Sequence, residues 1–246
     1  MPATIQNPPA ATDFALAFAR YGEMARSSAR KFETNWSDCV PCLADATAQT
    51  PFDRHYVYHT AWAARVLSRL SPQPAQHVDI ASSLYFAAIA SAFVPVAHYD
   101  YRRPDLSLPG LTCAGADLTC LPFADASIPS LSCMHVVEHV GLGRYGDPLD
   151  PDADLLAMRE LARVLAPGGS LLFVVPVGRP RVQFNAHRIY AFDQVLESFP
   201  SLDLAEFSLV PDRADPDGPA LIANATKAQS DRQRYGCGCF WLRRPA

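Results

Sequence analysis

Residues 133–151, CMHVVEHVGLGRYGDPLDP, concentrate side chains whose types and spacing could do chemistry. His135, Glu138 and His139 form an H-x-x-E-H pattern. In one class of zinc hydrolases this pattern places two metal-binding histidines and a water-activating glutamate on one helix. An apolar run precedes His135 and two glycines closely follow His139, so the sequence predicts a strand end and at most a very short helix here. A metallohydrolase is therefore the least favoured of the functions that we consider.

The elements around this stretch alternate between strand and helix patterns from residue 75 onwards. We expect strands at 77–81, 96–100, 111–117, 130–136, 170–176, 202–210 and 235–244, and helices at 83–93, 153–166 and 192–199. This alternation predicts an α/β protein with a mostly parallel, seven-stranded sheet that helices cover on both faces.

Residues 1–74 predict a helical extension that precedes this alternation. We expect a Pro- and Ala-rich tail over residues 1–11 and a helix from Thr12 to about Phe32, with Thr12 and Asp13 as candidate caps. A second helix is predicted over 54–70, where the prolines of the following SPQP segment end it.

The composition excludes several classes of protein. Hydrophobic residues make up 49% of the chain and charged residues 19%, which predicts a packed core. The formal net charge of −4 argues against a surface built to grip nucleic acid. The longest apolar run, 84–97, is too short to span a bilayer, and no basic segment followed by an apolar one begins the chain. We therefore expect a cytoplasmic protein, and its seven cysteines favour reduced thiols.

Five segments resemble, in their order, the class I S-adenosylmethionine (SAM)-dependent methyltransferases. They are HVDIASS, Asp100, GADLTCLPFADASIPSLSCMHVVEHV, LARVLAPGGSLLFVVP and FNAHRIYAFDQVLESF. The full H-x-x-E-H-x-G-L-G-R-Y-G-D-P stretch is similar to a methyltransferase-like family of unassigned function. The resemblance implies a Rossmann-like methyltransferase domain over residues 75–246 with SAM as its cofactor. It also implies that the helical extension, residues 1–74, forms a lid over the cofactor cleft. The candidate contacts are Phe52, Asp53, His55, Tyr56, Tyr58 and His59, although the aromatic residues among them could equally be plain core packing.

The loop after the first expected strand departs from the usual pattern of this superfamily. That loop is normally Gly-rich, whereas here Asp79 is followed by Ala81, Ser82 and Ser83. Ala tolerates positive φ poorly, so either Ala81 has a negative φ or the cofactor site is weakened. Ser82 and Ser83 could bind the cofactor's carboxylate through their hydroxyl or backbone N–H groups. We assign all four residues to the expected cofactor site.

The rest of the expected cofactor site follows the next strands. Asp100 comes 21 positions after Asp79, a spacing at which an acid hydrogen-bonds the ribose of nucleoside cofactors. The resemblance implies that Asp117 binds the adenine amino group and that Leu118 lies beside the ring. His135 is expected to line the same pocket.

The H-x-x-E-H residues also resemble a metal site found in some hydroxyl-modifying methyltransferases, which carry E-x-x-E-H there. The candidate ligands are His135, Glu138, His139 and, further along the chain, His187. A histidine in place of the first glutamate favours Zn, Mn or Fe over Mg. A metal there would lower the pKa of the substrate hydroxyl. Without a metal, His135 or His139 is the candidate base, and Glu138 orders a loop.

Substrate contacts are expected from the Gly-, Pro- and Asp-rich loop that begins at residue 140 and from the arginine-rich run GRPRVQFNAHR. The arginines could clamp a phosphate or carboxylate, unless they form a solvated surface; the loop could equally be structural. The candidate substrate residues are Arg144, Tyr145, Asp147, Asn185 and Arg188. These features favour a small molecule or sugar, anionic in character, over a nucleic acid.

Two cysteine pairs admit further interpretations. Cys39 and Cys42 form a C-x-x-C pair that could be redox-active, and together with Cys237 and Cys239 they could bind zinc through four thiolates. Cys237 and Cys239 fall in an expected strand, however, where small buried thiols are ordinary core residues.

The sequence therefore predicts a SAM-dependent methyltransferase that methylates an oxygen of a small molecule or sugar, with or without assistance from a metal. A non-catalytic methyltransferase-like binding module is the second hypothesis, because the loop at 81–83 lacks glycine. Binding of SAM or its product discriminates between the two. The acceptor atom, oxygen or nitrogen, and the oligomeric state stay open.

Overall fold

The computed structural model describes residues 11–30, 32–213, 215 and 218–246, and it divides the chain into two compact units, Met1–Phe52 and Asp53–Ala246. Almost all of the predicted N-terminal tail lies outside the described residues. In the first unit, α1 (Ala11–Arg26) is followed by the 3₁₀ helix η1 (Trp36–Asp38). The helix ends earlier than predicted because the Ser27 hydroxyl and N–H both donate to the Met24 carbonyl and close its last turn.

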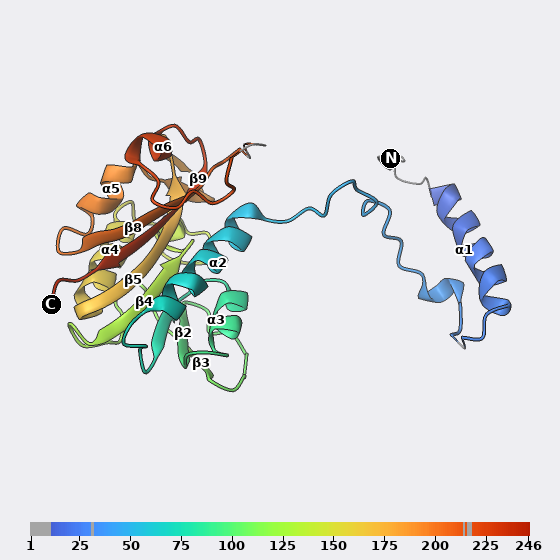
Figure 1. Ribbon diagram of the computed structural model, residues 1–246, viewed down its shortest axis with the longest axis horizontal. Coiled ribbons are helices and arrows are strands. Elements are labelled where there is room, and N and C mark those ends of the chain that lie inside the picture. Colours follow the sequence, from blue (N-terminus) through green and yellow to red (C-terminus); the bar gives the residue numbers. More distant parts are fainter. Residues whose placement is uncertain (1–10, 31, 214, 216–217) are drawn as a thin grey trace. The chain divides into compact units, whose positions relative to one another are not determined.

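The second unit is built on a seven-stranded sheet with the order β3-β2-β1-β4-β5-β9-β8. The first five of these strands are parallel, whereas β9 runs antiparallel to both β5 and β8. The strands are β1 (His77–Ile80), β2 (Val96–Asp100), β3 (Leu111–Gly115), β4 (Ile128–Met134), β5 (Leu165–Val177), β8 (Asp203–Val210) and β9 (Gly236–Arg243). The predicted α/β fold with a mostly parallel seven-stranded sheet is confirmed (Figure 1).

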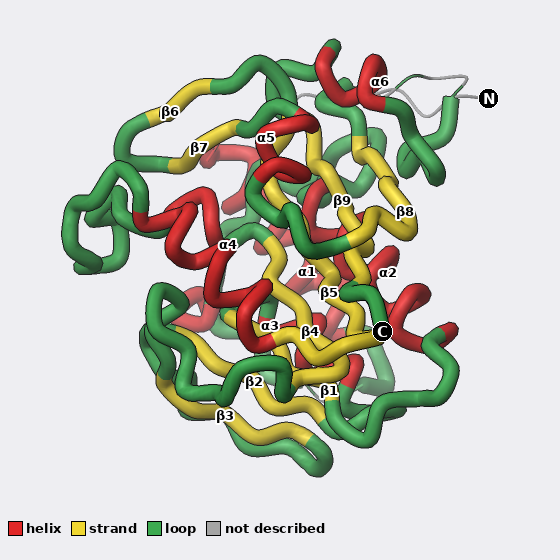
Figure 2. Tube along the Cα trace, turned by 90° about the vertical axis from the view of Figure 1, so that its left-hand side faces the viewer, coloured by secondary structure: helices red, strands yellow, loops and turns green. Residues whose placement is uncertain are grey.

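Helices cover both faces of this sheet. They are α2 (Arg54–Arg69) and α3 (Leu84–Ala90) on one face, and α4 (Ala153–Val164) and α5 (Phe192–Glu197) on the other, where Figure 2 shows them in front of the strands. The side chains of β5 alternate between the two cores: Leu171 and Phe173 pack on the α4 face, and Leu172 and Val174 on the α2 face. A short helix, α6 (Lys227–Asp231), precedes β9.

Helix α2 belongs to the sheet-containing unit. Asp53 caps it by accepting a hydrogen bond from the Tyr56 N–H, and the Trp62 indole donates to Glu206 of β8 at 2.8 Å. The compact units accordingly divide after Phe52, whereas the sequence analysis places the domain boundary at residue 74. The helical pattern of residues 54–70 gave no sign that its apolar face packs against the sheet.

A short antiparallel hairpin, β6 (Arg181–Gln183) with β7 (His187–Ile189), forms a second sheet that the sequence analysis did not predict. Its strands are three residues long and carry no alternating apolar pattern, so periodicity could not reveal them. No helix among the described residues is long and apolar enough to cross a membrane.

A buried polar network joins β1, β2 and β4 beneath the strand ends. The His77 ring bonds the Ser130 and Ser132 hydroxyls at 2.8 and 2.9 Å. The Ser132 hydroxyl donates to one oxygen of Asp79, and His98 Nδ1 bonds the other at 2.7 Å. Burial lowers the pKa of His77 to about 4, so this imidazole is neutral near pH 7. The network therefore satisfies its buried polar groups within the described part of the chain, except His98 Nε2.

Candidate active site

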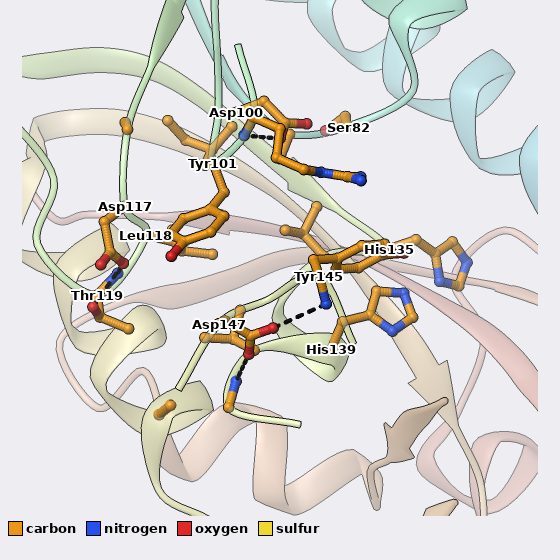
Figure 3. A pocket seen from close by; sticks show the side chains of 18 of the residues that line it. Ser82, Asp100, Tyr101, Asp117, Leu118, Thr119, His135, His139, Tyr145 and Asp147 are labelled. Atoms are coloured by element: carbon orange, nitrogen blue, oxygen red, sulfur yellow. Dashed lines mark hydrogen bonds between the residues drawn. The ribbon is translucent and has the colours of Figure 1, made fainter. Parts of the chain in front are cut away.

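A pocket of about 360 Å³ opens at the carboxyl ends of β1, β2, β3 and β4. After β1 the chain crosses one face of the sheet through α3, and after β4 it crosses the other face through α4. Open α/β sheets bind ligands at such a switch point between neighbouring strands. Ten of the predicted site residues line the pocket, most of them labelled in Figure 3. They are Ala81, Ser82, Ser83, Asp100, Asp117, Leu118, His135, His139, Tyr145 and Asp147.

The first loop keeps the backbone shape of a glycine turn without the glycine. Ala81 has φ 53°, and its N–H donates to the Tyr99 carbonyl at 2.6 Å. The Ser82 hydroxyl accepts from the Met134 N–H at 3.1 Å, which ties this loop to the end of β4. The alternative of a negative φ at residue 81 is therefore wrong, and the other alternative, a weakened cofactor site, stays a prediction. Ala81 instead adopts the left-handed conformation, at a cost in backbone strain.

Acidic and apolar groups from the next two strand ends form the far wall of the pocket. Asp100 ends β2 and accepts the Arg102 N–H through one oxygen. Asp117 follows β3 and accepts both the N–H and the hydroxyl of Thr119. The Leu118 side chain packs into the core but still reaches the pocket wall. This order of an acid, a second acid and an apolar side chain is the one that the sequence analysis expected.

Asp79 does not line the pocket. It is fully buried on β1, and both carboxylate oxygens are engaged, by Ser132 and His98. Its partners stand on β4 and β2, so no local pattern could identify them. Asp79 therefore holds strand ends in place, whereas the sequence analysis placed it at the cofactor.

The H-x-x-E-H residues do not lie on one helix. His135 follows β4 with φ 57°, and only Val137–His139 form a 3₁₀ turn, η2. His135 and His139 are thus not one α-helical turn apart, as the zinc-hydrolase interpretation requires. Instead, His135 Nδ1 lies 2.7 Å from Glu138 Oε1, and His139 Nε2 lies 3.8 Å from the same oxygen. The glutamate therefore sits between the two imidazoles.

Burial controls the protonation of this cluster. It lowers the pKa of His135 and raises the pKa of Glu138, because each loses hydration of its charged form. On α2, burial also lowers the pKa of His55 to about 4 and that of His59 to about 3. These imidazoles are consequently neutral at neutral pH.

His139 is oriented by a backbone contact. Its Nδ1 lies 2.6 Å from the Ala186 carbonyl oxygen, which can only accept, so the proton resides on Nδ1 and Nε2 carries the lone pair. Arg144 also donates to the Ala186 carbonyl, at 3.0 Å. His139 also lines the pocket, so its ring is held in a fixed orientation at the pocket edge.

The loop after His139 is organised by Asp147. Its carboxylate accepts the N–H groups of Gly141, Gly143 and Tyr145. Partial burial alone would raise the pKa of Asp147, but these donors outweigh it and hold the pKa below its usual value. Among the predicted substrate residues, Asp147 thus holds the loop in shape. The ring of Tyr145, another of them, lies under the Arg102 guanidinium at 4.6 Å.

Arg188 and its neighbours on β7 differ in their exposure. Arg188 is buried and donates to the carbonyls of Val140, Asp150 and Pro151, with an ion pair to Asp154 at 3.6 Å. Arg188 therefore holds the two ends of the loop that begins at residue 140. Asn185 is exposed at the hairpin turn, and His187 Nε2 bonds Gln183 Oε1 at 2.8 Å. None of Asn185, His187 and Arg188 lines the pocket.

Aromatic side chains from α2, and Tyr235 just before β9, cluster around His135 and His55. Its ring stacks on His55 and Tyr56, with centroids 5.4 and 5.6 Å apart, and His59 meets it edge-on at 5.0 Å. Tyr235 stacks on His55 at 5.0 Å. The α2 residues were among the expected lid contacts, and Tyr56 lines the pocket. Tyr235 was missed, because only the packing of β9 against α2 brings it here.

The chain was compared with known families and sequences. A family model described as "Caenorhabditis protein of unknown function, DUF268" matches residues 126–199, a segment that contains the H-x-x-E-H stretch and is less than a third of the chain. A search of curated proteins finds no match.

Solved structures match over most of the chain. The protein bound by the Trm112 methyltransferase activator of Haloferax volcanii is 19% identical, with 79% of this chain and 91% of that chain covered and a TM-score of 0.52. The 1,6-didemethyltoxoflavin N1-methyltransferase of Burkholderia thailandensis, solved with S-adenosylhomocysteine, is 12% identical (99% and 95% covered, TM-score 0.51). The N-methyltransferase NodS of Bradyrhizobium japonicum, also with S-adenosylhomocysteine, is 14% identical (77% and 89%, TM-score 0.50). The chain thus has the class I SAM-dependent methyltransferase fold, as the sequence resemblance predicted.

Proposed function

We propose that this protein is a SAM-dependent methyltransferase that acts on a small molecule. The observation that carries the proposal is the pocket at the strand switch point, whose wall contains every predicted cofactor residue except Asp79. Fold alone does not define activity, so the argument rests on these side chains.

The residues present fit SAM in both polarity and position. Asp100 would accept hydrogen bonds from the ribose hydroxyls, and Asp117 with Leu118 would hold the adenine. The turn at Ala81 lets the backbone at 81–83 approach the ligand, as a glycine turn would. When bound, SAM supplies an electrophilic methyl group on its sulfonium centre.

The protein's own contribution to the chemistry is to bind the acceptor and remove its proton. We assign the base role to His139, because the Ala186 carbonyl fixes its proton on Nδ1 and leaves Nε2 as an acceptor at the pocket edge. Glu138, close to Nε2, would stabilise the imidazolium that forms. A base of this kind suits a hydroxyl acceptor.

Two arginines beside Tyr145 support an anionic acceptor, such as a phosphorylated or carboxylated sugar, at this part of the pocket. Arg102 lines the pocket beside Tyr145, and Arg144 lies over the same ring at 5.1 Å. The predicted metal set contributes only His135 to the group of close ligand atoms found among the described residues, so the base role of His139 is proposed without a metal. A cytoplasmic location stays a prediction from the sequence.

The test combines binding with methyl transfer. Calorimetry with S-adenosylhomocysteine should show one site whose affinity falls at least about tenfold in Asp100→Ala, since two hydrogen bonds to a charged group are lost. Asp105→Ala is the matched control, because Asp105 is exposed and does not line the pocket.

Transfer from methyl-labelled SAM is then measured on panels of sugar, phenol and amine acceptors. We expect His139→Gln to lose about 100-fold or more in rate while S-adenosylhomocysteine affinity is retained. Failure to bind S-adenosylhomocysteine would overturn the proposal. Binding without transfer to any acceptor class would favour the non-catalytic module.

A further inference from the structure

Three potential metal ligands converge beside the pocket from elements far apart in the chain. They are His55 on α2, His135 after β4 and Cys237 on β9, and their ligand atoms all lie within 4.8 Å of one another. We propose that these three side chains bind a divalent transition metal of the zinc type. This inference concerns the protein without cofactor and does not depend on methyl transfer.

The hydrogen bonds around the two histidines match those of metal-binding imidazoles. A metal-bound histidine usually donates its second ring N–H to a carboxylate or a backbone carbonyl, which fixes the tautomer. His135 Nδ1 is bonded to Glu138 Oε1 at 2.7 Å, and His55 is hydrogen-bonded to the backbone of Tyr235. Each histidine thus has one nitrogen oriented by the protein and the other available to a metal.

The available nitrogen of His135 has no other task in the described part of the chain. Its Nε2 is buried and makes no hydrogen bond there. Leaving a buried polar atom unsatisfied is costly, and native structures usually supply a partner. Coordination to a metal would satisfy Nε2, while the Glu138 carboxylate would offset part of the added charge.

The donor set selects the kind of metal. Two imidazoles and a thiolate favour Zn²⁺ and similar borderline ions over Mg²⁺ or Ca²⁺. Ligand atoms around tetrahedral zinc are roughly 3.5 Å apart, as follows from its bond lengths, so the group must contract slightly on binding. His55 is only partly buried, so we expect its side chain to make that movement. Three protein ligands leave one position open, as in catalytic zinc sites.

Cobalt provides the test, because a Co²⁺–thiolate bond gives a near-ultraviolet charge-transfer band that His or carboxylate ligands do not. The full chain, stripped with a chelator, is titrated with Co²⁺ in the absence of SAM. We expect the band to saturate at one equivalent and Zn²⁺ to abolish it by displacement. Cys237→Ser should remove the band, whereas Cys133→Ser, which changes an equally buried thiol on β4 in the opposite core, should retain it.

Two further variants separate coordination from folding. His55→Ala changes a half-buried helix residue, so the chain should fold, yet its Co²⁺ affinity should fall at least about tenfold. Glu138→Gln should keep the band and weaken affinity about 10- to 100-fold, as loss of an orienting carboxylate does. No thiolate band in the wild-type protein, or an unchanged titration in His55→Ala, would overturn the metal site. S-adenosylhomocysteine binding measured on the same metal-free protein tests the cofactor proposal independently.

Discussion

Replacement of Ala81 by glycine should not destabilise the protein, although alanine-to-glycine changes usually do. Ala81 has φ 53°, where the Cβ of an L-residue costs about 1–2 kcal/mol. Glycine removes that strain, but the greater conformational freedom of its unfolded chain lowers the free energy of unfolding by about 0.4–1 kcal/mol. The free energy of unfolding should therefore rise by about 0.5 kcal/mol.

The control is Ala88→Gly in the interior of α3, where φ is helical. Both substitutions remove one methyl group, so they differ only in the backbone conformation of the site. Glycine there should cost about 1 kcal/mol. The two variants should thus differ by about 1.5 kcal/mol, or by roughly 3–6 °C in melting temperature for a domain of this size. Thermal and urea unfolding of the pair measure this difference directly.

The same substitution reports on the cofactor loop. Because glycine keeps the turn and removes strain, Ala81→Gly should bind S-adenosylhomocysteine at least as tightly as the wild-type protein. Ala81→Val should lose both stability and affinity, since a β-branched residue tolerates positive φ poorly. If Ala81→Gly were as destabilising as Ala88→Gly, the left-handed turn, and with it the explanation of the Gly-poor loop, would be refuted.

Two other variants test the roles of buried polar groups. His77 has a pKa of about 4 in the folded state and 6.5 unfolded, so the unfolded chain takes up the proton first as pH falls; stability is complete above pH 6.5 and is lost towards pH 4. Protonation of His77 in the unfolded chain should lower the free energy of unfolding by about 2 kcal/mol between pH 7 and pH 5. His77→Gln should lack this contribution, and a pH dependence equal to that of the wild-type protein would contradict the prediction. Arg188→Met should cost about 3 kcal/mol and expose the loop after residue 140 to protease, because three carbonyls and Asp154 lose their buried partner. Arg159→Met, on the exposed face of α4, should change stability by less than about 0.5 kcal/mol; equal effects of the two would count against the anchor.

The sequence predicted the strands and the pocket wall because both depend on local patterns. Apolar runs of strand length marked β1, β2, β4 and β5, and the polar residues just after them, such as Asp100 and Asp117, had to meet at one edge of a parallel sheet.

Residues whose roles depend on distant partners could not be assigned in this way. Asp79 was predicted to bind the cofactor and Arg188 the substrate, yet the side chain of each is hydrogen-bonded to partners on other elements. His55 and Cys237 had no common pattern in the sequence, and only the packing of α2 across the sheet brings them to His135. Ala81 likewise has a positive φ, and a hydrogen bond to Tyr99 on a neighbouring strand, that no local pattern indicated.

The central claim is that the pocket at the strand ends binds SAM, and thermal unfolding with and without S-adenosylhomocysteine tests it most directly. A ligand held by the native state at 100 times its dissociation constant adds about 2.7 kcal/mol to the unfolding free energy. We predict a clear rise in melting temperature for the wild-type protein and for Asp105→Ala, and a much smaller one for Asp100→Ala. An unchanged melting temperature at millimolar S-adenosylhomocysteine would contradict the account.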